Sequence, residues 1–141
     1  MFEDLLINPW AVLGSAVLGM VIGMLWYSPF LFGKLWMKLS HISEQDMEQA
    51  KKGAARAKSY GGAFLNGLVM SFVLAFFLDR VGAYDVVEGL IVAVMLWLGF
   101  VATVLFSAVL WERKPFSLFL IHAVQTLVFL AAASVVLMLF Q

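Results

Sequence analysis

The chain has 141 residues, of which 64% are hydrophobic and only 13% are charged. A soluble domain is about half apolar and a quarter charged, so the surplus apolar surface of this chain is expected to face lipid. Nine basic residues balance nine acidic ones and cysteine is absent. Nucleic acid is therefore not an expected partner, and disulfides and thiolate metal sites are excluded.

Four apolar segments are long enough to cross a bilayer. The first follows Asn8, a good N-cap, and has Pro9 at its first position, where the missing N–H costs nothing. None has a charge at its centre and none alternates like a membrane strand, so helices are expected. The sequence predicts an all-α integral membrane protein, a four-transmembrane-helix bundle that forms a single domain, residues 1–141. The predicted spans are residues 9–27, 60–78, 86–111 and 116–140.

Basic residues mark one side of the predicted bundle. The loop between the first two spans and the turn between the last two hold almost all of them, while the opposite side holds only Arg80. Loops rich in Lys and Arg remain in the cytoplasm, so both termini are expected outside. The basic residues on the cytoplasmic side are Lys34, Lys38, Lys51, Lys52, Arg56, Lys58, Arg113 and Lys114.

The predicted cytoplasmic loop, residues 33–59, has structure of its own. Ser43 followed by Glu44 and Asp46 is typical of a helix start, with a side-chain cap and acids in the first turn. Residues 47–58 are good helix formers. The sequence therefore predicts a short cytoplasmic helix that lies on the lipid headgroups or continues into the second span.

An aromatic segment at the end of the first span, residues 26–37 (WYSPFLFGKLWM), is distinctive. Together with residues 99–103 (GFVAT) and the turn at 111–113, it resembles a bacterial membrane family catalogued as domain of unknown function 1761. The resemblance implies a four-helix, multi-pass protein of the bacterial cytoplasmic (inner) membrane. It implies no activity, substrate or cofactor. The residues that carry the first motif are Trp26, Tyr27, Ser28, Pro29, Phe32, Gly33 and Trp36.

Small residues recur at every fourth position on the predicted helices. In lipid they allow the close backbone approach that holds helices together, so a compact bundle is expected. The stripe on the first helix is long enough to serve a second copy of the chain as well, which predicts a homo-oligomer. The alternative is that the stripe packs entirely within one chain. The principal packing residues are Ser15, Gly19, Gly23, Gly67 and Ser71.

Few strongly polar side chains lie inside the predicted membrane segments, and they fall at one depth in the cytoplasmic half. One interpretation is that they satisfy one another and lock the helices, because an unpaired amide or imidazole in hydrocarbon is costly. The other is that they line a cavity that binds or passes a small-molecule or lipid ligand. If one face of the last helix points inward, Asn66 and His122 meet. The cluster comprises Asn66, Thr103, Ser107, His122 and Gln125.

Two further chemistries are weaker. Ser107 and His122 resemble a nucleophile and its base, but no third residue would orient the imidazole, so an enzyme is not expected. Met20 and Met24 stand one helical turn apart, and thioethers are ligands for Cu(I). Methionine is also a common gap-filler in helix packing, which is the expected role here, so the sequence predicts neither a metal nor a cofactor.

Two functions remain. The sequence favours an oligomeric scaffold or accessory protein of the lipid bilayer, because proton-coupled exporters of this size need a membrane-embedded acid and this chain has none. The alternative is a small transporter or channel with a cytoplasm-facing polar cavity around Asn66, His122 and Gln125.

Overall fold

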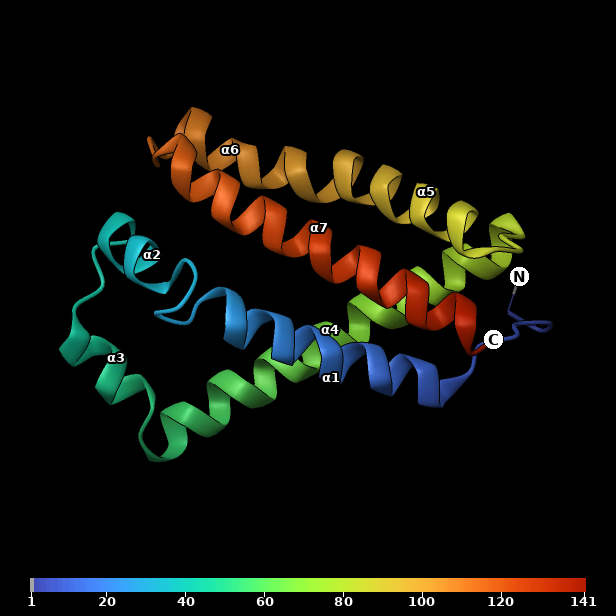
Figure 1. The fold of residues 1–141 in the computed structure, drawn as a ribbon, viewed down its shortest axis with the longest axis horizontal. Helices are drawn as coiled ribbons and strands as arrows, with labels where there is room; N and C mark the ends of the chain where they lie inside the picture. Colours follow the sequence, from blue (N-terminus) through green and yellow to red (C-terminus); the bar gives the residue numbers. More distant parts are fainter. Residues whose placement is uncertain (1) are drawn as a thin grey trace.

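The structure is a computed structural model that describes residues 2–141, and every regular element within them is helical (Figure 1). Seven α-helices and one π-helical segment follow one another along these residues. They are α1 (Pro9–Trp26), α2 (Gly33–Leu39), α3 (Glu44–Ala50), α4 (Gly53–Val81), α5 (Val86–Leu96), η1 (Trp97–Ala102), α6 (Thr103–Trp111) and α7 (Phe116–Leu139).

Four of these segments are long and apolar enough to cross a membrane: α1, α4, the continuous run from α5 through η1 to α6, and α7. This confirms the prediction of an all-helical chain with four such segments. Large apolar side chains are widely exposed on their outer faces, with 74% of Phe100 and 65% of Val104 accessible. A surface of this kind is incompatible with water, which identifies a multi-pass membrane protein.

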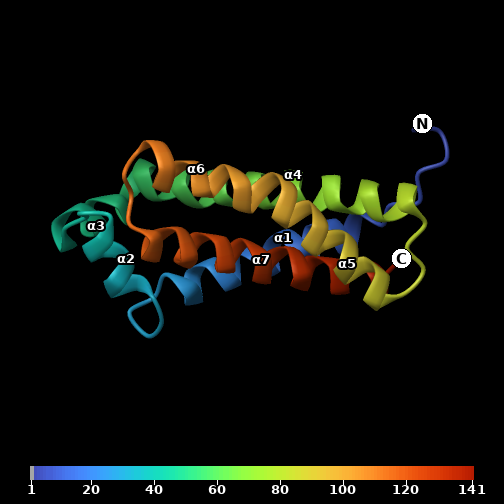
Figure 2. The ribbon, with the colours of Figure 1, turned by 90° about the horizontal axis from the view of Figure 1, so that it is seen from above.

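Helix α7 lies between α1 and the continuous run from α5 to α6, and α4 passes along α1 and α7 toward the start of α5 (Figure 1). Both termini lie at one end of the molecule, together with the turn between α4 and α5. Helices α2 and α3 and the turn between α6 and α7 lie at the other end (Figures 1 and 2). We call these the terminal end and the loop end. At the loop end α4 diverges from α6 and α7 (Figure 1).

The loop before α4 differs from the prediction of a single short helix. Ser43 does cap a helix, since its hydroxyl accepts from the Asp46 N–H and the Asp46 carboxylate accepts from the Ser43 N–H. That helix, α3, ends at Ala50, and Gly53 then takes a positive φ of 54° that interrupts the helical path. Helix α4 begins at Gly53, before the predicted start at residue 60. The pattern of helix formers could not locate this break because glycine adopts both conformations.

Helix α2 was not predicted, and it is held by the aromatic motif that precedes it. The N–H of Phe32 donates to the Trp26 carbonyl and that of Gly33 to the Ser28 carbonyl. A Cβ at residue 33 would lie 2.3 Å from the carbonyl oxygen of Tyr27, so only glycine fits here. The motif is therefore a compact turn that reverses the chain at the end of α1.

The stripe of small residues on α1 packs within the chain. Gly19 meets the Phe129 ring of α7 so closely that an added Cβ would lie 2.0 Å from it, and Gly67 of α4 lies against Ala16. Ser15 and Ser71 are buried, with 1% and 0% of each accessible. The face that suggested a second copy is therefore occupied by α4 and α7, in line with the alternative left open above.

Candidate functional site

A cavity of about 250 Å³ lies toward the loop end, between α1, α4 and α7. Glycines create part of the space, because a Cβ added at Gly23 would meet only the Gln125 amide nitrogen, at 4.0 Å. We call this the loop-end cavity. Its lining residues are Gly19, Met20, Gly23, Met24 and Tyr27 of α1 and its C-cap, Tyr60, Ala63, Asn66, Gly67 and Met70 of α4, and Gln125 and Phe129 of α7.

The polar groups of this cavity are only partly satisfied by the protein. Asn66 makes a weak contact from its amide nitrogen to the Met70 sulfur, at 3.9 Å. Among the hydrogen bonds within residues 2–141, none involves the Gln125 side chain. An amide in hydrocarbon that lacks a partner costs several kcal/mol. Water or a polar solute in the cavity would remove this cost.

His122 lies apart from Asn66 because its imidazole Nδ1 pairs with the Tyr27 hydroxyl, at 2.5 Å. Tyr27 lines the loop-end cavity, whereas His122 lines a separate cavity of about 190 Å³ at the turn between α6 and α7, beside Glu112 and Lys114. The predicted meeting of Asn66 with His122 is therefore wrong, because the end of α1 lies between them and supplies the partner. Asn66 and Gln125 both line the loop-end cavity.

Thr103 and Ser107 lie outside both cavities. Each hydroxyl bonds back to its own helix, Thr103 to the Gly99 carbonyl at 2.7 Å and Ser107 to the Thr103 carbonyl at 3.3 Å. Both residues are exposed on the outer face of the span. Their hydroxyls therefore need no partner from another helix, and Ser107 forms no pair with His122.

A second cavity, of about 530 Å³, opens at the terminal end between the same three helices. We call it the terminal-end cavity. Ala11 of α1, Ala75 of α4 and Leu137 of α7 form its floor, and Asn8, Asp79 and Gln141 supply polar groups around them.

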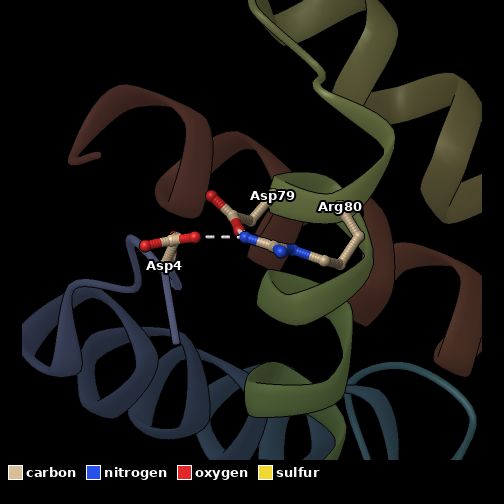
Figure 3. Close-up of polar contacts among 3 residues, drawn as sticks. All are labelled: Asp4, Asp79 and Arg80. Atoms are coloured by element: carbon tan, nitrogen blue, oxygen red, sulfur yellow. Dashed lines mark hydrogen bonds and ion pairs between the residues drawn. The ribbon is translucent and has the colours of Figure 1, made fainter. Parts of the chain in front are cut away.

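Polar ties surround this second cavity. The Asn8 side chain donates to the Phe140 carbonyl at 2.7 Å and joins the start of α1 to the end of α7. Arg80 donates to the backbone carbonyl of Asp4 at 3.1 Å and pairs with the Asp79 carboxylate, which joins the N-terminal segment to the end of α4 (Figure 3). The terminal-end cavity is thus framed by an ion pair and by contacts between distant segments.

A closed layer separates the two cavities. On α1, Ser15 lies four residues from Ala11 of the terminal-end cavity and four residues from Gly19 of the loop-end cavity. On α4, Ser71 lies in the same way between Ala75 of the terminal-end cavity and Gly67 of the loop-end cavity. At about 1.5 Å per residue, the layer is roughly 12 Å thick along α1. The hydroxyls of Ser15 and Ser71 are buried and have no hydrogen-bond partner within residues 2–141. The contact between α1, α4 and α7, which we call the seam, thus has a cavity at each end and buried serines without hydrogen-bond partners in the middle.

Residues 10–138 match the family described as protein of unknown function (DUF1761). The chain belongs to this family. No curated protein and no solved structure is significantly similar to it.

Three aromatic side chains of this DUF1761 chain form hydrogen bonds to α7 that the sequence does not predict. An aromatic residue with a polar tip at a span end is typical of a membrane-interface anchor, but the Trp26 indole donates to the Ile121 carbonyl at 2.9 Å and Tyr27 pairs with His122. Trp97 likewise donates to the Ala123 carbonyl at 2.8 Å. Aromatic residues with a polar tip near a span end are typical of both roles, so the sequence could not separate them.

Proposed function

We propose that this protein is a transporter that moves a small solute along the seam of α1, α4 and α7. The observation that supports this proposal best is the pair of cavities on the same three helices, one at each end and separated by one closed layer. A solute that entered one cavity would need only a rearrangement of this layer to reach the other. Substrate sites near the middle of the membrane are usual in transporters.

The composition of the layer supports movement. Small residues allow helices to approach closely without interlocking long side chains. Ser15 and Ser71 are buried without partners, so a displaced packing that gave their hydroxyls a partner would lose no hydrogen bond. Helix α4 already diverges from α7 at the loop end (Figure 1). We infer that α1 and α4 move against α7 to open the two cavities in turn.

The scaffold function has less support than it had from the sequence alone. The oligomeric part of that prediction depended on a small-residue face of α1 that was free to bind a second chain. That face packs on α4 and α7, with Ser15 only 1% accessible. Transport requires no second copy, because one chain contributes all the residues of both cavities.

As part of this proposal we place the protein in the bacterial cytoplasmic membrane with both termini outside. The basis is the concentration of Lys and Arg at the loop end, which is the usual signal for a cytoplasmic side. In this orientation the loop-end cavity faces the cytoplasm and the terminal-end cavity faces outward. Asp79 is the only residue of the two linings whose side chain carries a formal charge.

The absence of cysteine from the sequence provides a direct test. Gly23→Cys would place a thiol in the loop-end cavity, and Gly99→Cys is the matched control, because no atom lies within 4 Å of a Cβ there and the residue is exposed on the outer face. A small charged methanethiosulfonate reagent reacts only in water. We expect Gly23→Cys to react from the loop-end side and Gly99→Cys to remain unlabelled. Equal reaction at the two positions would refute a hydrated cavity.

A further inference from the structure

Three methionines line the loop-end cavity from two different helices. Met20 and Met24 stand one turn apart on α1, and Met70 faces the same space from α4. The sequence showed only the pair on α1, for which packing was the expected role. The third sulfur comes from residue 70, and only the fold brings α4 against α1.

The other lining groups restrict the kind of ion that this set of ligands could hold. The lining includes no carboxylate and no imidazole, so the charged oxygen ligands that hold Mg²⁺ and Ca²⁺ and the nitrogen ligands of Zn²⁺ are missing, and its hard ligands are only the neutral oxygens of Asn66, Gln125 and two tyrosines. Thioethers are soft and neutral, and they select Cu(I) and its chemical analogue Ag(I). A monovalent ion held by neutral ligands also brings the smallest charge into the membrane, where burial of charge is costly.

The surroundings leave the three methionine side chains room to adjust to an ion. The Asn66 amide contacts the Met70 sulfur at 3.9 Å. Methionine side chains have three rotatable bonds and adapt readily to a ligand, and Gly23 leaves space next to Met20 and Met24.

We propose that the loop-end cavity binds a soft monovalent metal ion, Cu(I) or Ag(I), through the thioethers of Met20, Met24 and Met70. This assignment deepens the proposed transport function and rests on it for its physiological meaning, since the ion is then the solute that is moved. Binding itself requires only the cavity. No electron transfer is involved, and the ion remains monovalent throughout.

The test uses Ag(I), which does not change oxidation state in air, added to the whole protein in detergent and measured by calorimetry and by metal analysis after desalting. The natural lack of cysteine removes the usual thiol background. We expect a single high-affinity site per chain, and a loss of affinity of at least about tenfold in the triple variant Met20→Leu, Met24→Leu, Met70→Leu. Leucine has nearly the volume of methionine, so the packing is kept.

Met95→Leu is the matched control, because Met95 is 63% exposed on α5 and lines none of the cavities described above. It should bind Ag(I) as the natural chain does. Absence of binding, or equal binding by the triple variant and the natural chain, would overturn the metal assignment. The thiol labelling of Gly23→Cys tests transport separately from these metal measurements. If Gly23→Cys is labelled but the natural chain binds no Ag(I), transport of another solute is still supported. If Gly23→Cys is not labelled, transport itself is contradicted.

Discussion

The contact between Gly19 and Phe129 allows a quantitative test of how α1 packs on α7. A Cβ at residue 19 would lie 2.0, 2.6 and 2.8 Å from three carbon atoms of the Phe129 ring. Ordinary contacts between carbon atoms are about 3.5–4.0 Å, so the ring would have to retreat by roughly 1.5 Å. Phe129 is only 6% accessible, and the loop-end cavity that it lines is the space into which its ring would retreat. Overpacking of this kind costs about 1–3 kcal/mol.

Gly14→Ala isolates this packing cost. Both glycines lie on α1, but no atom lies within 4 Å of a Cβ at residue 14. The gain in helix propensity from glycine to alanine is common to both variants and cancels in their difference. Gly19→Ala should therefore be less stable than Gly14→Ala by about 1–3 kcal/mol in reversible unfolding followed by circular dichroism in mixed detergent. Phe129→Leu, combined with Gly19→Ala, should recover part of the loss. Equal stability of the two alanine variants would refute the described packing.

Two further results are expected. Trp97→Phe removes the indole donor to the Ala123 carbonyl and should lower the free energy of unfolding by about 0.5–1.5 kcal/mol. Trp111→Phe is the control, because that side chain is 84% exposed, and it should change the free energy of unfolding little in the same assay. Equal losses in the two variants would contradict a hydrogen bond that joins η1 to α7. The pKa of Asp46 is lowered chiefly by the hydrogen bond from the Ser43 backbone N–H and, to a smaller extent, by the hydrogen bond with the Ser43 side chain. The capping box should therefore stabilise α3 at pH values above the ordinary carboxyl pKa, and this stabilisation should be lost as the pH falls through the lowered pKa. Amide exchange in α3 should accelerate over that acid range in the natural chain and not in Asp46→Ala, and identical pH profiles would count against the cap.

The helices were predictable because lipid imposes strict rules on the backbone. Long uncharged apolar runs leave only helices, so the four spans follow from composition and length. The position where α4 begins was not predictable, because it depends on the φ of Gly53. The π-helical turn at residues 97–102 also gave no periodic signal in the sequence, since a π-turn differs from an α-helical turn by only one added residue.

The candidate site was predictable only in part, because its polar side chains have several compatible partners. Asn66 and Gln125 both line the loop-end cavity. His122 was grouped with them because depth along a helix does not specify the direction in which a side chain points. The partner that it actually has, Tyr27, belongs to the turn after α1, where close packing around Gly33 fixes the path of the chain. Met70 joined the site for the same reason: neighbouring helices, not sequence spacing, bring it there.

The layer between the two cavities is where transport and a static bundle differ most. Ser71 is fully buried in it, and Ser71→Cys changes one oxygen to sulfur at the centre of the seam. The measurement is the reaction of this thiol with a charged methanethiosulfonate reagent, applied separately to the two sides of vesicles in which the protein has a single orientation. Transport predicts reaction from both sides, more slowly than at Gly23→Cys, because the layer opens to each in turn. Complete protection from both sides, in a protein whose Gly23→Cys variant reacts, would contradict passage along the seam.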